Sequence, residues 1–178
     1  MVECDDDVSP ASQPTRIIPV WDSQYSPAES SIEDGGFKAI WDGSSNTPYR
    51  YFRTETLFSS GSHTIELEIE SVDSLDLTLG VSWSSTSFTA DRNVYYFDQA
   101  ILYNVNCSSV TKNYNSIVNQ SVVKPTEIKK ISLNFDYDDR KIWWIINENI
   151  ETEHYDFTPD CEEVFITCGM RCGSATFI

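Results

Sequence analysis

Residues 62–70 read SHTIELEIE, and the spacing of their apolar side chains decides the fold class of this chain. Ile65, Leu67 and Ile69 occupy every second position, and the flanking and intervening positions are threonine or glutamate. Successive side chains of a β-strand point to opposite faces, whereas an α-helix repeats every 3.6 residues. The stretch therefore predicts a strand with one face in a core and the other in water.

The same alternation extends over most of the chain that follows. Residues 75–83 (LDLTLGVSW) and 131–138 (ISLNFDYD) repeat it, and residues 164–167 and 175–178 predict two more short strands. No stretch of about 11 residues shows helical periodicity. We therefore expect an all-β protein, an antiparallel two-sheet β-sandwich. Its core should contain Ile65, Leu67, Ile69, Leu77, Leu79, Leu133 and Phe135.

Two polar segments predict hairpin turns. Residues 71–74 separate the first two strands, and residues 137–140 (YDDR) lead into KIWWII at 141–146. The strand at 141–146 is apolar on both faces. That fits a central strand covered on both sides, or a strand whose outer face meets a loop or a partner.

The first 36 residues differ in composition from the rest. They contain eight acids, one base (Arg16) and four of the seven prolines. We expect residues 1–36 to form an extended leader and residues 37–178 to form the domain, with the boundary at Gly35-Gly36. The apolar cluster at residues 17–21 (IIPVW) either lies on the domain surface or serves as a linear motif for another protein.

The charge balance restricts the classes of partner. The chain has 28 acidic and 12 basic residues, a net charge of -16, and a sequence pI near 4.2. Because binding to a phosphate backbone depends on clustered lysine and arginine, we expect no nucleic-acid partner. The longest apolar run, residues 142–146, is far shorter than the roughly 20 residues of a membrane span, so no membrane insertion is expected.

The cysteines bear on compartment and on metal binding. The chain has five, which cannot all pair with one another, and the first residues lack the features of a signal peptide. Both observations predict a cytoplasmic, reducing location. Cys161, Cys168 and Cys172 lie close in sequence, but a structural zinc ion needs four ligands. We therefore expect ordinary core cysteines, no metal and no cofactor.

Groups that could support catalysis are scarce. His63 falls on the apolar side of its strand, His154 lies in a polar loop, and no nucleophile elbow or phosphate-binding loop is present. Asp136, Asp138 and Asp139 share one turn, where Ca²⁺ could bind, but they lack the glycine and glutamate of an EF-hand loop. We expect a hydrated turn there, and no enzymatic activity.

Four segments, in the right order, resemble the SPRY (B30.2-type) domain family. Residues 58–69 (FSSGSHTIELEI) resemble the serine- and glycine-rich turn, histidine and strand near the start of the domain. Residues 77–82 (LTLGVS) resemble its next strand, and residues 95–104 resemble its central aromatic segment. Residues 128–147 resemble the hairpin that follows. The chain departs from the family pattern where tyrosines replace a tryptophan and Asn147-Glu148 replaces an Asn-Gly pair.

The resemblance implies a non-catalytic protein–protein interaction module, an adaptor or complex subunit, that binds a peptide or protein surface through inter-strand loops. Arginine and aromatic residues, which dominate protein interfaces, gather in two such segments. The predicted partner-binding residues are Arg50, Tyr51, Arg53, Arg92, Tyr95 and Tyr96.

Two other interpretations compete with this one. The aromatic residues could be divided between core and surface while the arginines pair with nearby acids. A carbohydrate-binding, lectin-like sandwich is the rival function. It would use an exposed tryptophan or tyrosine as a sugar platform and Ca²⁺ where the aspartates cluster.

Overall fold

The structure is a computed structural model, and it describes residues 17–43, 49–70, 77–84, 99–105, 109–112, 115–119, 127–157 and 163–178. Within these residues the chain is almost entirely β. Two three-residue 3-10 helices, η1 (Ser23–Tyr25) and η2 (Asp34–Gly36), accompany the strands. No helix in the described ranges is long and apolar enough to cross a membrane.

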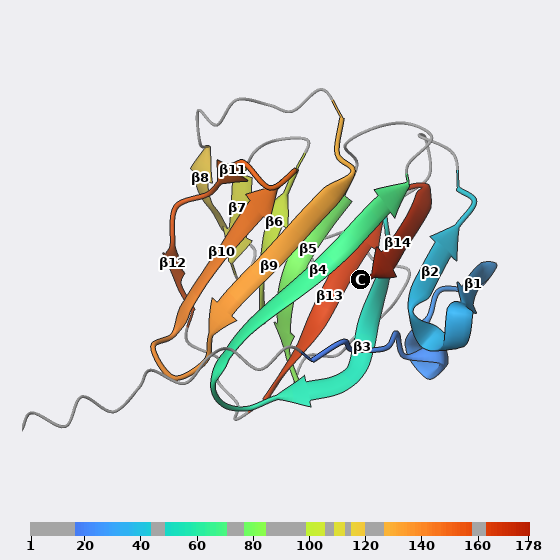
Figure 1. Cartoon of the computed structure of the whole chain (residues 1–178), viewed down its shortest axis with the longest axis horizontal. Coiled ribbons are helices and arrows are strands. Elements are labelled where there is room, and N and C mark those ends of the chain that lie inside the picture. The colour runs from blue at the N-terminus through green and yellow to red at the C-terminus, as the bar shows by residue number, and fades with distance from the viewer. Residues whose placement is uncertain are drawn as a thin grey trace, which may run out of the picture.

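The strands form two antiparallel sheets that lie face to face (Figure 1). The first sheet runs, in spatial order, through β1 (Ser30–Glu33), β2 (Lys38–Trp41), β14 (Gly173–Phe177), β4 (Ser62–Glu70), β9 (Lys130–Asp136), β10 (Lys141–Ile146) and β11 (Ile150–Glu151), with β12 (Tyr155–Asp156) paired to β10. The second runs through β3 (Arg50–Phe58), β13 (Val164–Met170), β5 (Leu77–Trp83), β6 (Ala100–Asn104), β7 (Ser109–Lys112) and β8 (Asn115–Asn119). The predicted two-sheet sandwich is therefore confirmed.

The core lies between the sheets and is built from the apolar positions of the alternating strands. Every residue that the sequence predicted for the core is buried, and Ile69 is the most exposed of them at 9%. On β5, Leu77 and Leu79 face inward together with Trp83. The period-two pattern thus identified the buried faces, because one side of each strand packs against the opposite sheet.

One predicted hairpin is confirmed and the other is wrong. Residues 137–140 form the turn between β9 and β10, which pair antiparallel. Residues 71–74 lie outside the described residues, but the strands that flank them belong to different sheets. β4 pairs with β14 and β9, so the chain crosses between the two sheets after β4 instead of turning back beside it.

The outer face of β10 meets a loop, which was one of the two options that its sequence left open. Trp143 is half-buried, and its ring stacks on that of His154 at a centroid distance of 4.4 Å. The inward residues Ile142, Trp144 and Ile146 are fully buried. β10 is therefore apolar on both faces because each face has something to cover it.

The described part of the predicted leader belongs to the sandwich. Trp21 is 1% exposed, stacks on Phe177 at 4.3 Å and donates its indole N–H to the carbonyl oxygen of Ala175 at 3.2 Å. Strand β1 pairs with β2 at the edge of the first sheet. A boundary at Gly36 does not separate the core from the residues before it, because one buried tryptophan anchors a segment whose average composition is polar.

Candidate interaction surface

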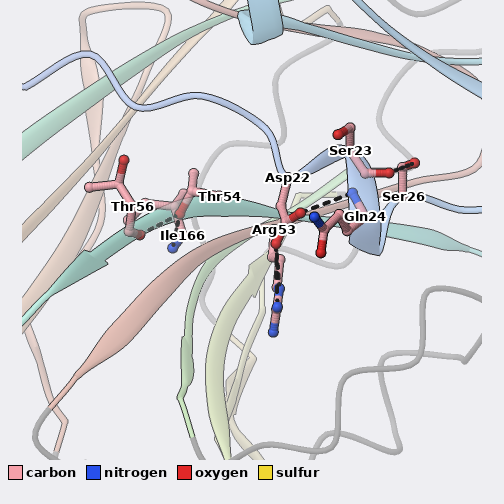
Figure 2. Close-up of polar contacts among 8 residues, drawn as sticks. All are labelled: Asp22, Ser23, Gln24, Ser26, Arg53, Thr54, Thr56 and Ile166. Carbon is pink, nitrogen blue, oxygen red and sulfur yellow. Dashed lines mark hydrogen bonds and ion pairs between the residues drawn. The ribbon is translucent and has the colours of Figure 1, made fainter.

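Strand β3 carries the three described residues of the predicted site, and it is an edge strand of its sheet. Its register with β13 shifts between Phe165 and Thr167. Thr54 replaces the lost ladder bonds with its side chain. Its Oγ1 accepts a hydrogen bond from the Ile166 N–H at 3.1 Å and donates to the Thr56 carbonyl oxygen at 2.9 Å (Figure 2). The hydroxyl thus satisfies the backbone at a bulge that would otherwise leave polar groups unpaired.

The N-terminal segment covers the edge of β3 at this bulge. Trp21 forms an isolated antiparallel bridge with Thr54. One residue further along, the Asp22 N–H donates to the Arg53 carbonyl oxygen at 2.8 Å. Because a paired edge is closed to a foreign strand, these bonds protect the middle of β3.

The Arg53 side chain is held by groups of its own chain. Its Nη2 lies 3.3 Å from Asp22 Oδ2, and its Nε donates to the same oxygen at 3.4 Å (Figure 2). The guanidinium carbon lies 3.4 Å from the ring centroid of Tyr25 and 4.3 Å from that of Phe165. The exposed fractions are 11% for the Arg53 side chain and 12% for that of Asp22. Arg53 therefore fastens the N-terminal segment to β3, which is the role that the interpretation of arginines pairing with nearby acids gave it.

Arg50 belongs to a different group, at the start of β3. Its guanidinium carbon lies 5.2 Å from the ring centroid of Trp41, and that of Arg171 lies 5.0 Å from the ring centroid of Tyr49. Arg50 is opposite the core residue Met170 in the register, so the two arginines lie at the same end of the sheet. They lie on its two faces, because Arg50 stacks on Trp41 of the core, whereas Tyr49 beside Arg171 belongs to a separate buried cluster with Tyr51. We call this group the arginine–aromatic cluster; it consists of Trp41, Tyr49, Arg50, Tyr51 and Arg171.

Tyr51 is the buried neighbour of Tyr49. Its exposed fraction is 0%, and its ring stacks with that of Tyr49 at 6.2 Å. Gly169 lies opposite Tyr51, and a Cβ at that glycine would collide with the Tyr51 ring and with the Thr78 hydroxyl. Glycine is therefore required there for the ring to approach the sheet so closely. Because Tyr51 has no exposed surface, its contribution to binding can only be indirect, through the position of Tyr49.

The structure brings together only part of the predicted site. Arg50 and Tyr51 are neighbours at the start of β3 but lie on opposite faces of the sheet, and Arg53 lies further along the strand in a separate network. Arg92, Tyr95 and Tyr96 lie outside the described residues, so their role stays a prediction.

Sequence reasoning missed Trp41 and Arg171. Arg171 lies in the CGMRC string at residues 168–172, whose cysteines are the more conspicuous feature. Its proximity to Arg50 depends on the pairing of β13 with β3, two strands that are more than a hundred residues apart in sequence. The sequence feature that could have identified Arg171 is its residue type, because the chain has few cationic side chains.

His63 has a structural role, as its strand position predicted. It is 9% exposed, its ring lies 4.8 Å from that of Phe58 and 5.0 Å from that of Phe135, and its Nε2 is 2.6 Å from the Ser60 carbonyl oxygen. A ring enclosed by two phenylalanines, with a nitrogen bonded to the backbone, is positioned for packing.

The aspartate turn is held by hydrogen bonds within the protein. Asp136 Oδ1 accepts the Asp139 N–H at 2.8 Å, and Asp136 Oδ2 accepts the Ser62 hydroxyl. The bond from the Asp139 backbone, followed by that from Ser62, holds the pKa of Asp136 below its usual value. Both carboxylate oxygens of Asp136 thus have a local structural function.

The described cysteines are buried free thiols. Burial raises the pKa of Cys168 to about 12, so this thiol stays protonated in the folded protein at neutral pH. Cys172 is also buried and free, and Cys161 lies outside the described residues. Within the described ranges, histidine, cysteine and carboxylate side chains form no group of three that could hold a metal ion.

Comparison with known proteins connects this architecture to solved structures. No protein-family model and no curated protein sequence matches the chain. The TRIM65 PSpry domain superposes with a TM-score of 0.65 over 92% of this chain and 93% of that domain, at 13% identity. The human HERC1 SPRY domain gives 0.64 over 88% and 96%, at 15% identity.

Stonustoxin gives a TM-score of 0.68 at 17% identity, and the match covers 92% of this chain but 27% of the toxin chain. Identities this low establish a shared fold, and they do not show that these proteins bind the same partner. The two-sheet arrangement described above is the fold of SPRY domains.

Proposed function

We propose that this protein is a non-catalytic protein-interaction module that binds a peptide or a protein surface at the arginine–aromatic cluster. Its SPRY-type fold supports the general class, because such domains commonly select the partner within a larger assembly. In that role the chain acts as an adaptor or a complex subunit, in a reducing cytoplasmic compartment where Cys168 and Cys172 remain thiols.

The observation that carries the proposal is the position of Arg50 and Arg171. Both are half-buried at one end of the second sheet, and each lies against an aromatic ring. A guanidinium group stacked on a ring keeps N–H groups at its edge, which suit carboxylates and carbonyl oxygens. Since the protein carries a charge of -16, it repels acidic partners in general, and two arginines at one end of the sheet create a local exception.

Affinity purification from native cells tests the proposal. Tagged wild-type protein should recover a partner, identified by mass spectrometry, whose yield falls at least about tenfold in the variant Arg50→Ala/Arg171→Ala. Arg140→Ala is the matched control, because Arg140 also lies over a tyrosine ring, at 4.3 Å from Tyr137, but outside the cluster. Equal recovery by the double variant and the wild type would reject the cluster as the binding site.

Carbohydrate binding remains the second candidate, and one observation favours it. The Trp143–His154 ring stack lies on the outer face of the first sheet, where 51% of the His154 side chain is exposed. Exposed aromatic rings are suitable platforms for sugars. A glycan array, probed with and without Ca²⁺, should show binding that Trp143→Ala abolishes if this function is the correct one. A blank array for the folded protein would eliminate it.

A further inference from the structure

A second surface lies toward the other end of β3, and most of its exposed side chains are apolar. We call it the β3 apolar patch and define it as the exposed side chains of Ile18, Tyr25 and Leu57 together with Phe165 beside them, which is buried at 9% exposure. Ile18 is 49% exposed, Tyr25 43% and Leu57 40%. Three of the four large apolar residues that are exposed within the described ranges therefore belong to the patch. Contiguous exposed apolar groups on a soluble protein commonly mark an interaction site.

The residues of the patch are linked through the strand register and through the Arg53 guanidinium. Leu57 pairs in the register with Phe165, whose ring lies 4.3 Å from the guanidinium carbon of Arg53. On the other side, the same guanidinium carbon lies 3.4 Å from the ring centroid of Tyr25. Ile18 lies three residues before Trp21, and Leu57 lies three residues after Thr54, so the Trp21–Thr54 bridge puts both at the same level of the antiparallel run.

The charged residues in and beside the patch differ in whether another residue neutralises them. Arg53 is neutralised by Asp22, and both side chains are nearly buried. Glu55 lies between Arg53 and Leu57 on β3 and is exposed. No described residue forms an ion pair with Glu55, whose backbone N–H is bonded to the carbonyl oxygen of Val20 at 3.0 Å. The patch therefore combines apolar area with one uncompensated negative charge.

These features select the kind of occupant. A second copy of this chain would bring another charge of -16 to the interface, and like charges disfavour that contact. We propose that the β3 apolar patch binds a segment of another protein that places an aliphatic or aromatic side chain on Tyr25 and Leu57 and a lysine or arginine on Glu55. This surface is separate from the arginine–aromatic cluster, and it gives the proposed interaction module a second contact of opposite charge preference.

A pair of synthetic peptides tests the proposal on the intact protein. The probe alternates leucine and lysine, the matched peptide alternates leucine and glutamate, and calorimetry measures the dissociation constants at physiological salt. The probe should bind and the glutamate peptide should not. Leu57→Ser should weaken probe binding about tenfold and Glu55→Gln about fivefold, as expected for an anchor residue and a neighbouring charge. Ile18→Ser provides a second apolar variant if Leu57→Ser fails to fold.

Matched controls separate this site from general attraction to an acidic protein. Glu68→Gln removes an exposed carboxylate on β4, in the other sheet, and Phe37→Ser removes an apolar side chain that is 37% exposed outside the patch. Both should leave probe affinity within about twofold of wild type.

The inference is overturned if the controls weaken binding as much as the patch variants, or if neither set has an effect. Sedimentation that shows self-association of the wild type, abolished by Leu57→Ser, would assign the patch to a second copy instead. The variant Arg50→Ala/Arg171→Ala should bind the probe as the wild type does, so failure at one surface is distinguishable from failure at the other.

Discussion

The two ends of β3 contain the same kinds of residue and use them differently. Arg50 and Arg53 are three positions apart, and each lies against aromatic rings. Arg53 is 11% exposed and shares an ion pair with Asp22, whereas Arg50 stacks on Trp41 at the start of the strand. Composition alone therefore cannot distinguish the arginine that fastens the N-terminal segment to β3 from the arginine that stacks on a core tryptophan; the segments that lie beside the strand decide between them.

The difference has a structural cause. Beside the Thr54 bulge, the free edge of β3 is bonded to the N-terminal segment through the backbone groups of Arg53 and Glu55. Asp22 comes with that segment, so the arginine nearest the bridge acquires an acid within the same chain. The start of β3 lies beyond this short pairing, beside Trp41 of the other sheet.

The largest effect is expected when the N-terminal segment loses its anchor. Trp21→Ala should lower the free energy of unfolding by ~3–5 kcal/mol, because it removes a buried ring and leaves a cavity against Phe177. Urea denaturation measures it. Ile18→Ala, three residues before Trp21 but 49% exposed, should change stability by no more than about 0.5 kcal/mol. A loss below about 1 kcal/mol for Trp21→Ala would show that the segment is only laid on the surface.

The Asp22–Arg53 contact should give the next largest effect. Each single alanine variant should cost about 1–3 kcal/mol, and the double-mutant cycle should yield a coupling energy of at least about 0.5 kcal/mol. The exposed pair Lys38–Glu70, at 3.1 Å with Glu70 75% exposed, serves as a control cycle. Its coupling should be smaller, since water screens exposed charges. Equal coupling in the two cycles would contradict a structural role for Arg53.

Cys168 provides a pH-dependent test of the packing of β13 against β3, since it pairs with Phe52 between the two ends of β3. Burial raises the pKa of its thiol to about 12, so the unfolded chain loses that proton first as the pH rises above about 8.5. The folded state then holds more protons than the unfolded state, and stability should fall between about pH 8.5 and 10. Chemical denaturation across this range should show a decline that is smaller in Cys168→Ala, and an identical slope in both proteins would contradict the burial.

The smallest effect on stability is expected at the arginine–aromatic cluster. Arg50→Ala and Arg171→Ala should each change the free energy of unfolding by about 1 kcal/mol or less, because each removes a partly exposed contact with a ring. Thermal denaturation measures this change. A larger loss would place these arginines with Arg53, among the residues that maintain the fold.

Period-two patterning was sufficient to predict the fold class and the buried face of most strands. Leu67 and Leu133 are buried, as their positions in the alternating pattern predicted, because successive side chains of a strand point to opposite faces. Strand pairing was harder, since it depends on contacts between distant segments. The crossing between sheets after β4, where a hairpin was predicted, has no local signature in the sequence.

The site was predictable in composition and not in geometry. The arginines and tyrosines at the start of β3 were identified from residue type, but the burial of Tyr51 depends on Gly169 in another strand. In the same way, Asp22, the acid that forms an ion pair with Arg53, comes from a segment whose polar composition suggested a leader. Averaged composition conceals a single anchoring tryptophan.

The most direct test of this division measures binding and stability on the same samples. For the partner recovered by the wild type, the dissociation constant and the melting temperature should be determined for Arg50→Ala/Arg171→Ala and for Arg53→Ala. The double variant should bind at least about tenfold more weakly with a nearly unchanged melting temperature. Arg53→Ala should melt several degrees lower and, while folded, bind as the wild type does. The account is contradicted if Arg53→Ala abolishes binding at unchanged stability, or if the double variant binds normally.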